Sequence, residues 1–376
     1  MILLLMYNAP NYWKIIPSHQ TNPVLFRPTI PRIVGPTTIT ATLSTLHPTA
    51  SRLMTFYTLS RLGNQMFLLA SLLGISRSYP VGVWTVCVNP DLFVRRVFPA
   101  VAALPTCRPG AGNFTQPYMT YNELRCCHYY SELMWNISTD QHVYFKDNFL
   151  QSWKYFVNIS DDVRRLFQFS PAISDRAKAL LKDALKNHFR CRRCLRNVTA
   201  VGVHVRRGDL VHVSPDVGYF HRAMDHEVRR LYPNFADTNV RSEVHPTLTV
   251  DDKRPEFHRN QSSTAGTPTN VYQDHTTSAT QALSNVRRHV FVVCSEDLDW
   301  CLKNIGGRDD VIFIRSGDAA VDLAILSMCH GSIIATGSYG WWAAWLAGGH
   351  TVANDEWTPN FSLTKKDYFP PSWLIM

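Results

Sequence analysis

The stretch DLAILSMCHGSIIATGSYGWWAAWLAGG, from Asp322 to Gly349, decides the fold of this chain. It predicts a helix over Ala319–Cys329, an apolar strand over Ser332–Thr336 and a second helix over Gly340–Ala347. The residues before it continue the pattern, with strand His289–Cys294, helix Asp297–Asn304 and strand Val311–Arg315. Strands that alternate with helices of this length form βαβ units around a parallel sheet. We therefore expect a Rossmann-like α/β fold with ligands at the carboxyl ends of its strands.

The same alternation continues toward the N-terminus. It predicts strand Ala200–Val205 and helix Tyr219–Leu231, and earlier a strand over Met54–Leu59, a turn that begins at Gly63, helix Gln65–Arg77 and strand Val81–Val88. The chain accordingly divides into an N-terminal α/β domain over residues 52–199 and a C-terminal Rossmann-like domain over residues 200–376.

Two segments lack such periodicity. Residues 1–51 are rich in Pro and Thr and are expected to form a stem, and residues 233–285 contain few large apolar side chains. A segment of that composition cannot bury enough surface to offset chain entropy, so we expect a disordered insertion there. The apolar run Met1–Met6 is too short to span a bilayer, and no window of 18 apolar residues occurs.

Composition narrows the class of protein. The 376 residues are 45% hydrophobic and carry 38 Lys and Arg against 29 Asp and Glu, a formal net charge of +9. This excludes a disordered tail, a collagen and a disulfide miniprotein. The positive surplus indicates an anionic partner, which can be nucleic acid, a membrane surface or a phosphorylated small molecule. The chain contains no recognised nucleic-acid motif or basic helix that would support the first of these partners.

The sequence also carries signs of a secretory compartment. Six Asn-x-Ser/Thr sequons occur, at Asn113, Asn136, Asn158, Asn197, Asn260 and Asn360. Nine cysteines leave at least one thiol free or bridged to another molecule. The sequons favour the lumen of the secretory pathway, with all six asparagines as candidate glycosylation sites.

The densest chemical signal is VGVHVRRGDL, from Val201 to Leu210. An apolar strand delivers His204, Arg206 and Arg207 at its carboxyl end, followed by a glycine and Asp209. Strand alternation places His204 and Arg206 on one face and Arg207 on the other. A guanidinium group matches phosphate oxygens bidentately, although a structural Arg–Asp pair would leave the same pattern.

A second signal, ATGSYG, follows the strand at Ala335. Gly337 and Ser338 form a turn and Gly340 opens a helix, whose N-terminal N–H groups favour an anion. The pattern is neither a GxGxxG fingerprint nor a Walker A loop. Asp322 is expected to face the same crevice, where it contacts a base edge or ribose or simply complements the helix dipole.

The pair Asp297 and Asp299 leaves a further alternative open. The two residues have the D-x-D spacing of metal-dependent nucleotide-sugar enzymes. Acidic residues are also ordinary at a helix N-terminus, which is where the pattern places them.

Three motifs in this order resemble the hallmarks of the galactoside α-1,2-fucosyltransferase (galactoside 2-L-fucosyltransferase) family. They are RLGNQM over Arg61–Met66, HVRRGD over His204–Asp209 and GSYGWWAAWLAGG over Gly337–Gly349. The resemblance covers residues 52–373 apart from the insertion.

The resemblance implies a GT-B-like glycosyltransferase, with two Rossmann-like domains facing a cleft, the N-terminal one on the acceptor side. It implies inverting transfer of L-fucose from GDP-β-L-fucose to a glycan hydroxyl, the 2-OH of a terminal β-galactoside, with no metal and no cofactor. It also implies a single-pass type II Golgi membrane protein acting on glycoproteins or glycolipids. Residues 1–51 would then be the stem and the remnant of an anchor.

The family's functional residues map onto this sequence. Arg206 would hold the β-phosphate and serve catalysis, and Asn64 and Gln65 would face the fucose and the acceptor. The other donor-binding positions would be His204, Arg207, Asp322, Gly337, Ser338 and Gly340.

Alternatives remain at two points. Asp209 is the nearest candidate for a general base, but it can equally pair with Arg207, and a reaction with late proton transfer needs no base. The acceptor can be a protein hydroxyl or another sugar, and a relative that binds GDP or glycan without turnover would keep the same motifs.

Overall fold

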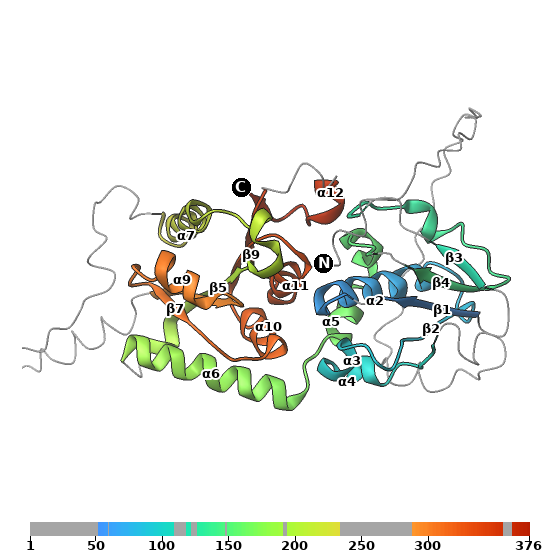
Figure 1. The fold of residues 1–376 in the computed structure, drawn as a ribbon, viewed down its shortest axis with the longest axis horizontal. Coiled ribbons are helices and arrows are strands. Elements are labelled where there is room, and N and C mark those ends of the chain that lie inside the picture. The colour runs from blue at the N-terminus through green and yellow to red at the C-terminus, as the bar shows by residue number, and fades with distance from the viewer. Residues whose placement is uncertain are drawn as a thin grey trace, which may run out of the picture. The chain divides into compact units, whose positions relative to one another are not determined.

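The computed structural model describes residues 52–58, 60–108, 118–121, 126–146, 149–190, 194–233, 288–355 and 363–376. The predicted stem and nearly all of the predicted insertion lie outside these ranges. Within the described ranges the chain is α/β with two parallel sheets, as predicted (Figure 1).

The N-terminal sheet has four parallel strands in the order β2-β1-β4-β3. Their bounds are β1 Arg52–Tyr57, β2 Trp84–Val86, β3 Tyr118–Tyr121 and β4 His142–Lys146. Helix α2, Leu62–Arg77, connects β1 to β2 and buries most of its residues. The expected turn at Gly63 is wrong, because Gly63 lies within the first turn of α2.

Short helices also occur among the described residues of this half of the chain. They are α3 Val94–Val97, α4 Pro99–Ala102, η2 Ser131–Met134, η3 Trp153–Tyr155, η4 Val157–Ile159 and α5 Ser160–Leu166. A disulfide joins Cys87 to Cys107, and a second joins Cys126 to Cys127.

The C-terminal sheet has six parallel strands in the order β10-β9-β8-β5-β6-β7. Their bounds are β5 Val198–Val205, β6 Arg288–Ser295, β7 Val311–Phe313, β8 Gly331–Ile334, β9 His350–Ala353 and β10 Leu374–Ile375. Counted from β5 and read from the β7 edge, this is the order 3-2-1-4-5-6 of the Rossmann fold. Its switch point lies between β5 and β8, so a ligand is expected beyond the carboxyl ends of these two strands.

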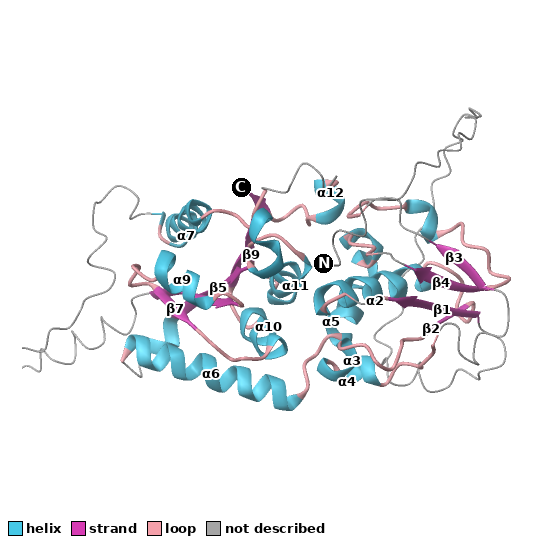
Figure 2. Ribbon diagram, viewed as in Figure 1, coloured by secondary structure: helices cyan, strands magenta, loops and turns pink. Residues whose placement is uncertain are grey.

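Helices cover both faces of the C-terminal sheet (Figures 1 and 2). Strand alternation separates the two faces: Val290 and Val292 of β6 belong to the core that includes α10, Ala319–Ser327, and α11, Ser338–Ala347. Phe291 and Val293 pack instead with α7, Val217–Leu231, and α9, Leu298–Ile305. No helix in the described part of the chain is both long and apolar enough to cross a membrane.

Helix α6, Pro171–Phe189, has no counterpart among the predicted elements. Ser170 caps it, since its side chain accepts a hydrogen bond from the N–H of Ile173, and Pro171 occupies the first turn. The helix packs against α10 and β7 of the C-terminal sheet although it precedes β5 in the chain. The region that covers the C-terminal sheet therefore includes residues before Val198.

The end of the chain returns to the N-terminal half through helix α12, Lys365–Tyr368. The Asp367 side chain is buried and accepts hydrogen bonds from Lys154 Nζ at 2.6 Å and the Tyr129 N–H at 3.1 Å. Burial alone would raise the pKa of Asp367, but these hydrogen bonds outweigh it and hold the pKa below its usual value. The ionised carboxylate thus ties the two halves together.

Replacing Asp367 with asparagine should lower the free energy of unfolding at pH 7 by about 1–3 kcal/mol, because it leaves Lys154 without its charged partner. A carboxyl whose folded pKa is depressed contributes stability above its unfolded pKa and loses it as the pH falls through the folded value. The deficit of the variant should therefore shrink in acid. Urea unfolding of Asp367→Asn beside Asp183→Asn, which removes an exposed i,i+3 pair, measures it. Equal effects of the two substitutions would contradict the inter-half role.

Candidate active site

The switch point of the C-terminal sheet brings together the two motifs that follow β5 and β8. His204 of β5 lies opposite Ile334 of β8 in the parallel register. Arg206 follows the end of β5, and α11 begins at Ser338 after β8. The HVRRGD and GSYG motifs therefore meet at one edge of the sheet, as predicted for ligand-binding residues.

Arg206 is held by an acidic partner that the sequence interpretation missed. Its Nη1 lies 2.6 Å from Oε1 of Glu296, and the same oxygen accepts a hydrogen bond from the Arg207 N–H at 2.8 Å. Ser214 donates its hydroxyl proton to the Arg206 carbonyl. The Arg206 side chain is only 15% exposed, so its guanidinium lies at the edge of the core beside a carboxylate.

Arg207 points to the other face of the sheet, as strand alternation predicts. Its Nε pairs with Asp297 Oδ2 at 3.3 Å, and its guanidinium carbon lies 4.2 Å from the centre of the Trp300 ring on α9. These contacts hold Arg207 away from the His204 face. The predicted part of Arg207 in donor binding stays a prediction.

His204 is buried against the start of α11. A side chain on Gly340 would place its Cβ 2.6 Å from His204 Nδ1, so only glycine allows this approach. The Tyr339 ring lies 5.0 Å from the imidazole, centre to centre. Burial lowers the pKa of His204 to about 4, despite the opposing field of Glu296, so the imidazole is neutral at physiological pH. Its Nδ1 is buried with no hydrogen-bond partner among the described residues.

The depressed pKa of His204 predicts an acid-sensitive fold. The unfolded imidazole takes up a proton near pH 6.5, whereas the folded one does so only near pH 4. Stability should therefore fall as the pH drops through this window. We expect the slope of unfolding free energy against pH to be shallower in His204→Asn than in wild type. The difference should correspond to at most one proton taken up on unfolding. Identical slopes for the two proteins between pH 4 and 6.5 would show that His204 titrates normally in the folded state.

Asp322 lies near the same tyrosine. Burial raises the pKa of Asp322, against the effect of a hydrogen bond from Ser316, and the Asp322 carboxyl is among the groups that raise the pKa of Tyr339. The Oδ1 atom of Asp322 is buried with no hydrogen-bond partner among the described residues. His204 and Asp322 thus each have a buried polar atom with no hydrogen-bond partner among the described residues, and such an atom is ordinarily paired with a protein group, an ordered water or a ligand.

The start of α11 is an uncapped helix N-terminus. Its N-cap residue is Gly337, which has no side chain to bond the first N–H groups. Gly337 adopts φ +113° and ψ 158°, a region that essentially only glycine occupies. The N–H groups of a first helical turn and the positive end of the helix dipole can bind an anion.

Asn64 connects this helix start to the N-terminal half. Its Oδ1 accepts hydrogen bonds from the Ser338 hydroxyl and from Gln151 Nε2 at 2.9 Å. A Cβ on Gly63 would lie 2.7 Å from the Tyr339 nitrogen, so the starts of α2 and α11 touch. The RLGNQM and GSYG motifs, far apart in sequence, therefore form one cluster.

Gln65 lies beneath this cluster and is buried. Its Nε2 donates to the Ser60 carbonyl at 2.7 Å, and its Oε1 accepts from the Val94 N–H at 2.9 Å. These bonds fix the segment before α2. The predicted contact of Gln65 with fucose or acceptor stays a prediction.

Asp209 lies in η6, Gly208–Val213, and its side chain is not among those that the structure describes.

The acidic pair Asp297 and Asp299 is used within the protein. Asp297 caps α9, since it accepts a hydrogen bond from the Trp300 N–H, and it pairs with Arg207. Asp299 pairs with Arg315 on the exposed surface. The two carboxylates serve separate partners, which fits the helix N-terminus interpretation.

The aromatic run of α11 is a packing element. Trp341 and Trp342 are fully buried, and both rings lie against Phe67 of α2, at 4.5 and 5.1 Å between centres.

Among the sequons, Asn136, Asn158 and Asn197 are exposed, whereas Asn113, Asn260 and Asn360 lie outside the described residues.

The fold and the site define a class of protein. A parallel sheet in Rossmann order, with an arginine and an uncapped helix N-terminus at its switch point, is typical of an α/β protein that binds a nucleotide or a similar phosphorylated ligand. The comparisons with known proteins specify the class further. Residues 274–376 match the family model described as Glycosyl transferase family 11.

Curated relatives agree with that match. The chain is 29% identical over 232 residues to galactoside alpha-(1,2)-fucosyltransferase 2 of Sus scrofa, covering 59% of this chain and 53% of that protein. It is 26% identical over 362 residues to galactoside alpha-(1,2)-fucosyltransferase 1 of Homo sapiens, covering 87% and 76%. The chain thus spans about half the length of the first relative. The chain is thus similar in sequence to galactoside α-1,2-fucosyltransferases.

Solved structures of fucosyltransferases are also similar to the chain. Fucosyltransferase NodZ from Bradyrhizobium is 14% identical with a TM-score of 0.42, covering 78% of this chain and 93% of that one. A variant of Arabidopsis thaliana FUT1 in complex with GDP is 12% identical with a TM-score of 0.44, covering 89% and 80%.

Proposed function

We propose that this chain transfers L-fucose from GDP-β-L-fucose to the 2-OH of a terminal β-galactoside, with inversion and without a metal ion. The observation that carries the proposal is the cluster of Arg206, the uncapped start of α11 and the Asn64–Ser338 contact at the switch point. The names of the curated relatives support the reaction and the linkage.

The site supplies what the departure of GDP requires. Cleavage of the bond between fucose and phosphate leaves additional negative charge on the β-phosphate, and fixed donors aimed at that charge stabilise the transition state. Arg206 and the first N–H groups of α11 are such donors on neighbouring strand ends. His204 and Asp322, the residues that the family resemblance assigns to the base, would contact the guanine.

The acceptor side would be built around Asn64. Its carboxamide lies at the junction of α2 and α11, held by Ser338 and Gln151. We propose that this amide faces the fucosyl group, and that Asp209 is the candidate base for the acceptor hydroxyl.

The proposal is tested by incubating the purified chain with GDP-fucose and a panel of β-galactosides, other sugars and peptide acceptors, with and without EDTA. We expect a fucosylated β-galactoside whose new bond is cleaved by a linkage-specific α-1,2-fucosidase, at an initial rate that EDTA leaves unchanged. Transfer only to peptides or other sugars would overturn the acceptor. Binding of GDP without any product would favour a relative that has lost turnover.

Glu296 would compete with the donor. Its carboxylate bonds both Arg206 and the Arg207 N–H, the groups a phosphate would need. Glu296→Gln should therefore bind GDP several-fold more tightly, because the substitution removes a competing and repelling charge. Calorimetry of the variant and of wild type with GDP measures this. Weaker binding in the variant would mean that Glu296 instead positions Arg206 for the ligand.

We also propose that the chain works in the lumen of the Golgi apparatus as a type II membrane protein. The exposed sequon asparagines and the Cys87–Cys107 disulfide support an oxidising compartment with glycosylation. Expression in animal cells should give a protein whose apparent mass falls on treatment with N-glycosidase F. A protein without N-glycans would contradict this placement.

A further inference from the structure

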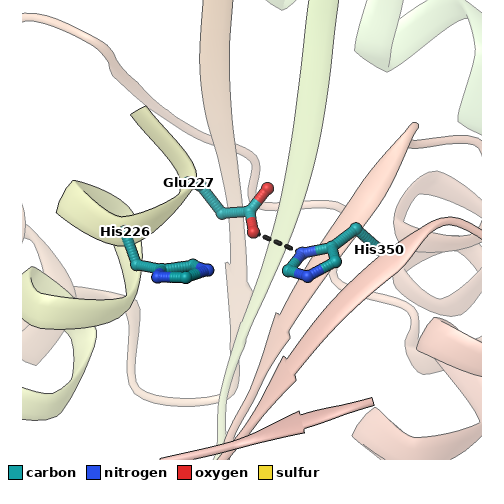
Figure 3. Close-up of side chains that lie close together, drawn as sticks. All are labelled: His226, Glu227 and His350. Carbon is teal, nitrogen blue, oxygen red and sulfur yellow. Dashed lines mark hydrogen bonds and ion pairs between the residues drawn. The ribbon is translucent and has the colours of Figure 1, made fainter. Parts of the chain in front are cut away.

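Three potential metal ligands meet at the amino-terminal ends of the strands of the C-terminal sheet, whereas the candidate active site lies at their carboxyl ends. His226 and Glu227 lie on α7, and His350 is the first residue of β9 (Figure 3). One ligand atom from each lies within 4.8 Å of the others. His350 pairs with Gly331, the first residue of β8, so the group lies at the amino ends of these strands. The α11 start lies at the carboxyl ends.

The geometry of the group is already close to that of a metal site. Three atoms no more than 4.8 Å apart fit within a circle of radius about 2.8 Å, while zinc bonds to His and Glu are about 2.0–2.2 Å long. Displacements of the three ligand atoms by less than about 1 Å would bring them to bonding distance of one metal ion. The imidazole rings of His226 and His350 lie side by side and nearly parallel, with their centres 5.9 Å apart and their planes inclined by 21° (Figure 3).

Glu227 is oriented by the protein rather than by solvent. It is fully buried, and its Oε2 accepts two hydrogen bonds from Arg230, at 3.0 and 2.7 Å. Its Oε1 accepts a hydrogen bond from His350 Nδ1 at 2.5 Å. Arg230 is partly exposed and fixes the far oxygen, which is the role that an outer-shell partner has in metal sites.

We propose that His226, Glu227 and His350 bind one Zn²⁺ or a similar borderline divalent transition metal, with water completing the coordination. Two imidazoles and a carboxylate are a ligand set that zinc prefers, whereas Mg²⁺ and Ca²⁺ require mostly oxygen ligands. Binding would replace the hydrogen bond between His350 Nδ1 and Glu227 by bonds from both residues to the metal, and the single proton of the neutral imidazole would then reside on Nε2, with no net proton released.

The metal would stabilise the fold and take no part in transfer. It would join α7 to β9. Helix α7 is the last described helix before β6 in the chain, so the metal would fix its position against the sheet. Because the site lies at the strand edge away from the α11 start, its loss should leave the initial rate of fucosyl transfer unchanged. This inference does not rest on the proposed function.

The test uses the full chain, without an affinity tag and freed of metal, titrated with Co²⁺ and then Zn²⁺. We expect one equivalent of Co²⁺ to give the visible absorption of a low-symmetry, four- or five-coordinate ion, and Zn²⁺ to abolish it. Zn²⁺ at a hundredfold excess over its Kd should lower the unfolding equilibrium constant about 100-fold and raise Tm, while Mg²⁺ should not.

Variants distinguish this site from other ligands. His226→Ala removes a partly exposed side chain and should abolish both the absorption and the Tm shift, and His350→Gln provides an independent second variant. His221→Ala, on the same helix but bonded to the Asn304 carbonyl, should retain both. Absence of stoichiometric Co²⁺ absorption in wild type, or unchanged binding in both site variants, would overturn the proposal.

Discussion

Replacing Arg206 with alanine is expected to lower kcat for fucosyl transfer by about 100- to 1000-fold, the usual cost of losing one fixed donor to a developing negative charge. Arg206→Lys should also lose most of the activity, because an ammonium group cannot reproduce the bidentate fork of a guanidinium. Steady-state rates with saturating GDP-fucose and acceptor measure the effect.

Two matched variants separate the role of Arg206 from general damage. Arg315→Ala removes an exposed arginine that also pairs with a carboxylate, and should leave kcat unchanged. In Arg206→Ala the Glu296 carboxylate loses its partner, so the double variant Arg206→Ala with Glu296→Gln tests whether an unpaired carboxylate causes the loss. Near-normal turnover in Arg206→Ala would contradict the assignment, and recovery in the double variant would shift the cause to Glu296.

Gly340→Ala is expected to be the most damaging substitution of a single small residue. The new methyl group would lie 2.6 Å from His204 Nδ1 and 3.3 Å from Ile334 Cβ, so the buried imidazole or the start of α11 would have to shift. Overpacking of this kind costs about 1–3 kcal/mol of stability. Since the displaced groups include His204 and the start of α11, GDP binding should be lost as well.

The matched control for this substitution is Gly307→Ala. A Cβ at Gly307 would meet no atom within 4 Å, so the same chemical change occurs there in open space. Thermal unfolding and GDP titration of both variants give the comparison. If Gly340→Ala unfolds at the wild-type temperature and binds GDP normally, His204 does not lie against α11 as described.

The alternation of side chains between the two faces of each strand made much of the fold predictable. β5 shows why: Val201, Val203 and Val205 enter one core while His204 faces α11, so a period of two in the sequence gives the faces directly. The observed β5 begins two residues earlier than expected and β2 is shorter, because apolar runs do not mark where strand pairing ends. Helix α6 was predictable from its Ser170 cap and Pro171, signals typical of a helix start.

The partners within the candidate site were not predictable. Glu296 lies 90 residues from Arg206 in sequence, and only the pairing of β5 with β6 brings them together. The contact of Asn64 with Ser338 spans 274 residues and depends on packing between α2 and α11. Short-range patterns identify residue types at strand ends, but neighbours across the fold are set by tertiary packing.

The central claim is that the edge formed by the end of β5 and the start of α11 holds the diphosphate of the donor. Calorimetric titration of wild type and Arg206→Ala with GDP and with GMP, which lacks the β-phosphate, tests it most directly. We predict one site for GDP on wild type, much weaker binding of GMP, and GDP affinity in Arg206→Ala reduced to that of GMP. Equal binding of GDP and GMP by wild type, or undiminished GDP binding by Arg206→Ala, would contradict the claim.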